Sequence, residues 1–177
     1  MSDFFPPPLP PKPETERPTP VWWAPPRDEL GREVPERAIL GSSDSAVVAL
    51  LGFVVYSTGF TFRLLTLLRE PLGLRRISPS FDTVDPNPLL KFAIEWPTGA
   101  ILSSLNKTPA FNSQPDPPVL NSLGRSASSS EWRFYQEWWV WPLPPPGRVR
   151  LLCEWPQEGV ARSGHEIDLY SLFAAGL

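Results

Sequence analysis

The chain has 177 residues, of which 41% are hydrophobic and 25 are proline, and its formal net charge at pH 7 is -3. This length fits one domain with a tail, and the proline content excludes long helices, because a proline in a helix interior costs ~3 kcal/mol. The slightly acidic balance provides no basic stripe for binding nucleic acid. The single cysteine, Cys153, excludes an internal disulfide and a cysteine-rich metal site. We expect neither a metal nor a cofactor.

The N-terminal stretch is rich in proline and poor in aliphatic side chains. It favours polyproline II and does not bury enough surface to fold alone. Residues 7–12, PPLPPK, form a P-x-x-P motif followed by a cation, a pattern that aromatic-grooved domains recognise. A spacer, or an arm laid across a partner or its own domain, is the simpler interpretation. We predict an extended arm over residues 1–20, with Phe4, Phe5 and Leu9 as its contact residues, and a single domain over residues 21–177.

The N-terminus has no charged region followed by an apolar core, so we do not expect a secretory signal. The most apolar run, Ala46 to Tyr56, is about half the ~20 residues that a membrane helix needs. These features predict a cytoplasmic, soluble protein without a membrane partner.

The first ordered stretch is expected at Val21 to Pro26, where Trp22 and Trp23 point to opposite sides of an extended chain. One tryptophan of the pair would enter the core while the other covers an edge. The alternation and β-branched content that follow predict several strands. In order, we expect a charged connector at 27–35, a short strand at 37–40, a hairpin of two long strands at 45–56 and 60–69, and a loop at 70–88.

Residues 89–96 alternate cleanly, and a turn at 97–99 leads to a short strand at 100–102. The segments KFAIEWPTGAI (91–101) and RLLCEWPQEGVA (150–161) both end a strand in Glu-Trp-Pro. A shared strand-to-turn solution, in which tryptophan closes one end of the core and proline stops the ladder, explains this. An internal duplication is the alternative. Residues 103–130 are rich in Ser, Asn and Pro and predict a long loop, mobile over 122–130.

The segment Glu131 to Pro156 holds five of the eight tryptophans and two strand-like runs separated by prolines. It predicts a hairpin whose first strand is covered on both faces or carries an adhesive outer face, since both faces are aromatic. After a turn at 159–164 we expect a strand at 165–168 and a helix at 169–175 capped by Asp168. Alternation predicts eight side chains in one core: Leu90, Phe92, Ile94, Trp96, Val149, Leu151, Cys153 and Trp155.

Chemistry-bearing residues are few. His165 is the only histidine, and Ser163, Glu166 and Asp168 lie close to it, yet neighbours along a strand face opposite ways and do not form a triad. Cys153 is expected to be a buried, inert thiol. Glu95, Glu137 and Glu154 stand beside tryptophans, as in sugar-cleaving sites, but glutamates on the wet face of a strand explain them equally well.

The order of motifs resembles a group of uncharacterised actinobacterial proteins. The likeness runs from about Pro18 to the C-terminus through VYSTGFTFRL, EWWVWPLPPPGRVRLLCEWP and EIDLYSLFAA. The resemblance implies a bacterial source and a single β domain, and it carries no functional residue.

Together these patterns predict an all-β fold, an antiparallel β-sandwich of about seven or eight strands with Pro-rich loops and a short C-terminal helix. A small barrel is the alternative. The favoured function is a non-enzymatic protein-interaction or assembly module, which meets another protein or a second copy through the arm and an aromatic surface. A carbohydrate-binding sandwich with a tryptophan platform is the alternative, and a hydrolase has no supporting constellation. Beside the arm residues, the predicted contacts are Trp23, Trp139 and Trp141.

Overall fold

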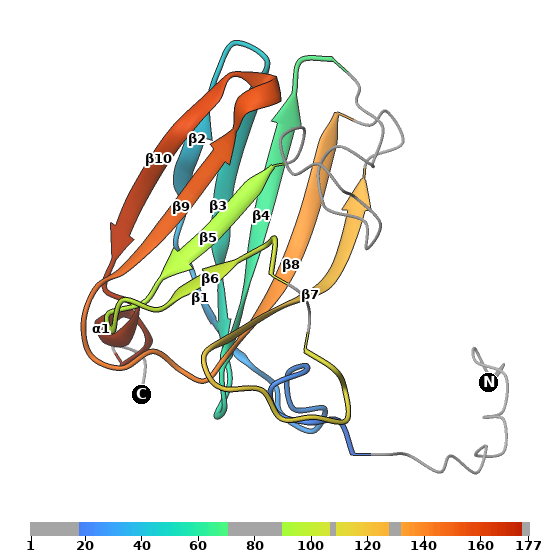
Figure 1. Ribbon diagram of the computed structural model, residues 1–177, viewed down its shortest axis with the longest axis vertical. Helices are drawn as coiled ribbons and strands as arrows, with labels where there is room; N and C mark the ends of the chain where they lie inside the picture. The colour runs from blue at the N-terminus through green and yellow to red at the C-terminus, as the bar shows by residue number, and fades with distance from the viewer. Residues whose placement is uncertain (1–17, 71–89, 107–108, 128–131, 175–177) are drawn as a thin grey trace, which may run out of the picture.

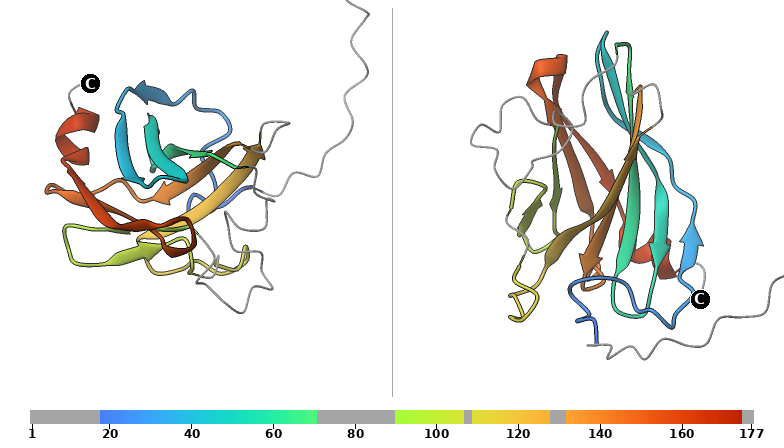
Figure 2. Two further views of the ribbon diagram at one scale, coloured as in Figure 1. Left: turned by 90° about the horizontal axis from the view of Figure 1, so that it is seen from above. Right: turned by 90° about the vertical axis from the view of Figure 1, so that its right-hand side faces the viewer.

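Two antiparallel sheets pack face to face in a computed structural model that describes residues 18–70, 90–106, 109–127 and 132–174. Figure 1 shows the smaller sheet in front of the larger one, and the side view in Figure 2 shows the two layers edge-on. The all-β sandwich expected from the alternating runs is confirmed.

The described residues contain ten strands, a 3-10 turn and one short helix, against the seven or eight strands predicted. The strands are β1 Arg32–Val34, β2 Ala38–Ser42, β3 Ala46–Val55, β4 Phe60–Leu68, β5 Lys91–Glu95, β6 Ile101–Ser103, β7 Val119–Ala127, β8 Arg133–Trp141, β9 Val149–Trp155 and β10 Val160–Ile167; the turn is η2 Pro156–Glu158 and the helix is α1 Leu169–Ala174.

The larger sheet has six strands in the order β1-β3-β4-β8-β7, with β2 also paired to β3. Strands β3 and β4 form the predicted hairpin, which Tyr56 closes by donating its amide hydrogen to the carbonyl of Gly59 at 2.9 Å. A Cβ on Gly59 would lie 2.3 Å from the carbonyl oxygen of Val140, so only glycine fits this turn. The hairpin is therefore held from both its own turn and the neighbouring strand β8.

The smaller sheet has four strands in the order β10-β9-β5-β6. All eight side chains predicted to share one core belong to the buried cluster between the sheets. Strands β5 and β9 are antiparallel neighbours, so Trp96, which follows β5, and Trp155, the last residue of β9, lie at opposite ends of the pair. Both indoles are buried, as expected if each tryptophan closes one end of the core.

Aromatic rings from both sheets meet in the core. Phe60 of β4 stacks on Trp96 with ring centroids 6.5 Å apart and planes 7° apart, and Phe62 lies 5.2 Å from Phe92. Phe173 of α1 packs on Phe60 at 5.0 Å. Large buried rings of this kind contribute roughly 2–3 kcal/mol each to stability. These contacts therefore hold the two sheets together.

The predicted hairpin over Glu131 to Pro156 is wrong. Strand β8 pairs with β4 and β7, whereas β9 pairs with β10 and β5, so the proline-rich segment 142–148 crosses from one sheet to the other. Prolines lack amide donors and favour extended backbone. They end pairing at β8 and suit a chain that must span the ~10 Å between sheets.

Three further predictions are corrected. Residues 119–127, expected to lie in a long loop, form edge strand β7, and residues 32–34 of the charged connector form β1. Strand β10 begins at Val160 rather than after Gly164, because the turn is already completed by η2 and Gly159. The polar residues of these edge strands resemble a loop in the sequence. Their strand conformation becomes evident only from the hydrogen bonds of their backbone to the neighbouring strand.

The helix α1 was predicted with Asp168 as its cap. The Asp168 carboxylate accepts hydrogen bonds from the backbone amide of Ser171 at 2.9 Å and from its hydroxyl at 2.7 Å. The hydrogen bond from the Ser171 amide is the main cause that lowers the pKa of Asp168 below its ordinary value. Leu169 and Phe173 are buried, so the helix packs on the domain through these two side chains. No helix among the described residues is long and apolar enough to cross a membrane.

Candidate functional site

The outer face of the six-stranded sheet, which faces away from the core, contains the predicted contact residues Trp139 and Trp141. Alternation along β4 and β8 points Phe62, Leu64, Phe134 and Trp138 inward, which leaves the intervening residues on the outer face. The pairing register places these in rows across the sheet, with Thr61 beside Trp139, Arg63 beside Glu137 and Leu65 beside Tyr135.

One part of this face is fully covered, and we call it the covered half. It consists of Thr61, Val119, Asn121 and Trp139, all buried, with Trp139 at 0% exposure. The Trp139 Nε1 donates a hydrogen bond to the carbonyl of Val21 at 3.0 Å, and its ring meets Tyr56 edge-on at 5.8 Å. The N-terminal segment around Val21 therefore forms a lid over the end of the sheet shown at the bottom of Figure 1.

Two polar contacts fasten the chain around this lid. Asn121 donates its Nδ2 to the carbonyl of Trp22 at 2.7 Å. The carboxylate of Glu29 accepts hydrogen bonds from the Ser57 amide at 2.7 Å and the Ser57 hydroxyl at 2.6 Å. Burial raises the pKa of the Tyr56 phenol beside them, and the carboxylates of Glu137 and Glu29 raise it further. The phenol therefore stays neutral at physiological pH.

The remaining part of the face is mainly apolar, and no described segment covers it as the residues around Val21 cover Trp139; we call it the open half. The open half brings together side chains from β2, β3, β4 and β8, of which Ile39 is 68% exposed and the others are partly exposed. Its members are Ile39, Val47, Ala49, Leu65, Leu67 and Tyr135.

Charged residues border the open half. Arg63 and Glu137 lie side by side in the row between the two halves, and Arg133 lies opposite Leu67 at the other end. When one face of an antiparallel sheet meets solvent, that face is usually polar. A contiguous apolar group with a charged border is typical of a surface that meets another macromolecule.

The three tryptophans predicted as contact residues do not form one exposed aromatic surface. Trp139 is fully buried and cannot stack on a ligand, because the segment around Val21 covers it. Trp23 and Trp141 are partly buried, and Trp23 meets Phe111 edge-on at 5.3 Å and 80°. Phe4, Phe5 and Leu9 lie outside the described residues. Trp132, which we did not single out, is 44% exposed.

The sequence signal for the open half was available in the alternation of the β3–β4 hairpin. Leu65 and Leu67 blur the pattern of β4, because they are apolar residues at positions where polar ones are expected. Val47 and Ala49 do the same on β3. The pairing register places all four residues together on the outer face.

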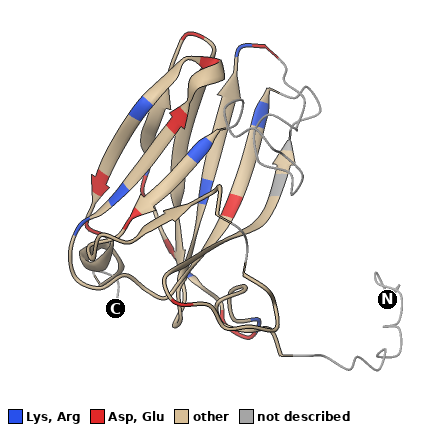
Figure 3. Cartoon of the chain, viewed as in Figure 1, with Lys and Arg blue, Asp and Glu red and all other residues tan. Residues whose placement is uncertain are grey.

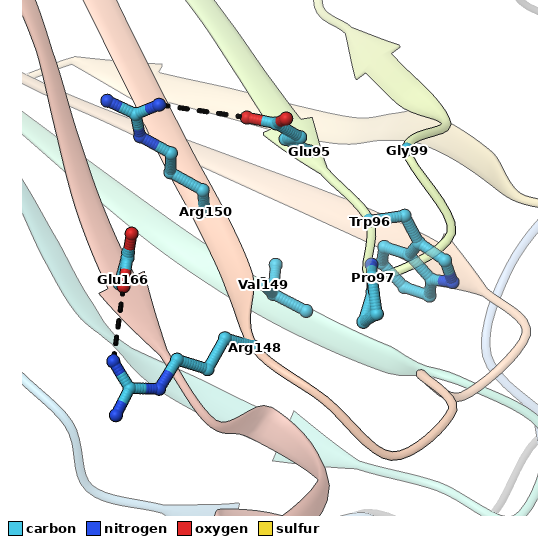
Figure 4. Close-up of a pocket in the computed structure, with 8 residues that line it drawn as sticks. All are labelled: Glu95, Trp96, Pro97, Gly99, Arg148, Val149, Arg150 and Glu166. Atoms are coloured by element: carbon cyan, nitrogen blue, oxygen red, sulfur yellow. Dashed lines mark hydrogen bonds and ion pairs between the residues drawn. The ribbon is translucent and has the colours of Figure 1, made fainter.

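A shallow pocket of about 370 Å³ lies on the outer side of the four-stranded sheet. Figure 4 shows it between Trp96, Pro97 and the side chains of two ion pairs. Arg148 lies 3.3 Å from Glu166, and Arg150 lies 3.9 Å from Glu95. All four charged side chains are largely exposed, so each pair contributes at most ~1 kcal/mol.

Ion pairs join neighbouring strands over much of this sheet. Lys91 pairs with Glu154 at 3.7 Å, in addition to the two pairs at the pocket. Figure 3 shows the two signs alternating along β5, β9 and β10. A sheet face with balanced charges of this kind suits contact with water, and it differs sharply from the open half of the other sheet.

The residues around His165 do not form a triad. The hydroxyl of Ser163 donates to the carbonyl of Leu40, Glu166 pairs with Arg148, and Asp168 caps α1. Each candidate partner is therefore engaged elsewhere. Within the described residues, no group of three or more His, Cys, Asp and Glu side chains could hold a metal ion.

The expected inert character of Cys153 agrees with its surroundings. The thiol is buried, and burial, with a smaller effect of the Glu154 carboxylate, raises its pKa to about 12. A thiol with this pKa is protonated at physiological pH and is a poor nucleophile.

The three glutamates beside tryptophans do not form a pair of catalytic carboxylates. Glu137 is on the six-stranded sheet, whereas Glu95 and Glu154 are on the other. Glu95 and Glu154 lie four register positions apart on β5 and β9, roughly 13 Å along the strands at ~3.3 Å per residue. Carboxylates that cleave glycosidic bonds stand about 5–10 Å apart.

Comparison with protein-family models, curated proteins and solved structures gives no match to this chain.

Proposed function

We propose that the protein is a non-enzymatic protein-interaction module whose binding surface is the open half. The observation that carries this proposal is the set of six apolar residues on the solvent side of an antiparallel sheet. Aliphatic side chains on a sheet face offer shape and apolar area but few hydrogen bonds. Such a surface suits another protein better than a sugar, which needs polar partners for its hydroxyl groups.

A carbohydrate-binding sandwich is the second candidate, and the tryptophan arrangement weakens it. Stacking on a sugar ring requires an exposed indole face, and Trp139 is covered while Trp23 meets Phe111 edge-on. Trp132 is the remaining exposed indole among the described tryptophans. We propose that the protein-interaction module acts in the bacterial cytoplasm.

The test uses the full-length chain with Leu65→Glu and Leu67→Glu combined, and Ile101→Glu as the matched control. Ile101 is 57% exposed on β6 of the other sheet, so it receives the same apolar-to-acidic change outside the open half. Thermal melts first establish that both variants fold. Sedimentation velocity and quantitative capture from a host extract then measure self-association and partner binding.

We expect the double variant to lose at least ten-fold in captured partner or in self-association, and the Ile101→Glu control to match the parent. Equal capture by all three proteins contradicts the proposal. Retained binding of a polysaccharide that is lost on Trp132→Ala would favour the carbohydrate candidate instead.

A further inference from the structure

The described chain enters the outer face of the six-stranded sheet at its covered end. Pro18 is its first residue, and three residues later the Val21 carbonyl accepts the hydrogen bond from Trp139. Trp22 then bonds to Asn121 on the neighbouring strand β7. The segment that precedes Pro18 is therefore tethered at the covered end of the sheet (Figure 1), whose outer face is apolar in its other half.

The preceding segment is long enough to reach the open half. From Thr61 in the covered half to Leu67 at the far end of the open half is roughly 20 Å, at ~3.3 Å per strand residue. A polyproline chain extends ~3.1 Å per residue, so Leu9 reaches roughly 28 Å from Pro18 and Phe5 roughly 40 Å. The reach of Phe5 thus exceeds the span of the face by roughly 20 Å, which allows for the path from Pro18 to Thr61, and Leu9 follows it closer to the covered half.

The chemistry of the arm matches a sheet face. Backbone groups in the interior of a sheet are already paired, so a segment that docks on the face must not bury unpaired donors of its own. Five of the eight residues from Phe4 to Pro11 are prolines, which have no amide donor. These eight side chains are uncharged, and so are the six side chains of the open half.

From these three observations we propose that residues 1–17 of the arm, in the same chain, are the occupant of the open half, with Phe4, Phe5 and Leu9 against its aliphatic side chains. A tether of this length holds the arm at an effective concentration on the order of millimolar. The arm of a second copy therefore competes only at protein concentrations near that range. The inference rests on the proposed function, because it names what occupies the proposed binding surface when no partner is bound. A partner must then displace the arm to reach that face.

The experiment uses the full-length chain with a spin label on Ser2→Cys. Cys153 is 1% exposed, so a thiol-reactive label attaches to the introduced cysteine alone. The intensities of the backbone amide signals in NMR spectra are compared between the oxidised label, which is paramagnetic and broadens nearby signals, and the reduced label, which does not. We expect a several-fold loss of intensity for Val47, Ala49, Leu65 and Leu67, and clearly smaller losses along β9 and β10 of the other sheet.

Two variants of the labelled protein test the contact from both sides. Phe4→Ser combined with Phe5→Ser removes the anchors, and Leu65→Glu combined with Leu67→Glu changes the receptor face. Either pair is expected to restore the intensities, whereas Ile101→Glu is expected to leave the losses in place. Losses spread evenly over the surface, concentrated on the other sheet or unchanged in both pairs would overturn the proposal.

A mixed sample separates the same chain from a second copy. It contains isotope-labelled protein without the spin label and spin-labelled protein without isotope, at micromolar concentration. We expect no loss of intensity in this sample; losses at the open half would make the arm of a second copy the occupant and overturn docking within one chain. No partner is present, so failure here leaves the proposed function intact, and the capture experiment can fail while the arm contact stands.

Discussion

The covered half and the open half of the outer face share strands β4 and β8, and their residues nevertheless have opposite environments. On β8, Tyr135 and Trp139 point to the same side four residues apart, yet Tyr135 is partly exposed and Trp139 is buried. The difference is the segment around Val21, whose carbonyl bonds to Trp139. Burial on an outer face therefore depends on what lies over the sheet, while alternation decides only which side a residue takes.

The largest expected difference between the halves comes from removing the covered indole. Trp139→Ala should cost ~3–5 kcal/mol of unfolding free energy, because it leaves a cavity and removes the hydrogen bond to Val21. The matched change in the open half, Tyr135→Ala, should cost under ~1.5 kcal/mol, since the side chain already contacts water. Urea denaturation of both variants measures this, and equal costs would remove the distinction between the halves.

Adjacent leucines on β4 give a sharper pair. Leu64 is fully buried in the core, and Leu65 belongs to the open half. Leu64→Ala should cost ~2–5 kcal/mol, and Leu65→Ala should cost under ~1 kcal/mol, because its side chain is only partly buried. Urea denaturation measures both, and equal losses would contradict the placement of Leu65 on the outer face.

The hydrogen bond that fastens the lid is expected to have an intermediate effect. Asn121→Ala removes the bond from its Nδ2 to the Trp22 carbonyl and should cost ~1–2 kcal/mol, because that carbonyl loses a buried donor. Ser122→Ala, an exposed change on the same strand, is the control. Hydrogen exchange should also show faster exchange of the Trp23 amide in the Asn121 variant alone. Identical exchange in both variants would show that this contact does not hold the lid.

Deletion of the arm should produce the smallest change in stability. Removing residues 1–17 leaves Val21 and Trp22 in place and should lower the unfolding free energy by under ~1 kcal/mol, because the chain entropy lost on docking offsets most of the free energy of the contacts. Removing residues 1–23 uncovers Trp139 and should cost several times more. Thermal melts of both truncations test this, and a large loss for the shorter deletion would show that residues 1–17 are an integral part of the fold.

The sequence by itself determined the local features. The β3–β4 hairpin joins neighbouring runs across a three-residue break, the Asp168 cap lies three residues from Ser171, and the eight inward residues follow from period-two alternation. Each depends on residues close together in the chain or on a strand's own geometry, which does not change with the rest of the fold.

The tertiary structure alone decided which strands are partners and which surfaces are covered. Whether residues 142–148 turn back or cross to the other sheet depends on where β5 and β10 lie, and the paired state of β7 depends on β8. The burial of Trp139 depends on a carbonyl 118 residues away in the chain. Period-two alternation contains no information on such distant contacts, so it left the same tryptophan equally compatible with a binding surface and with a covered sheet.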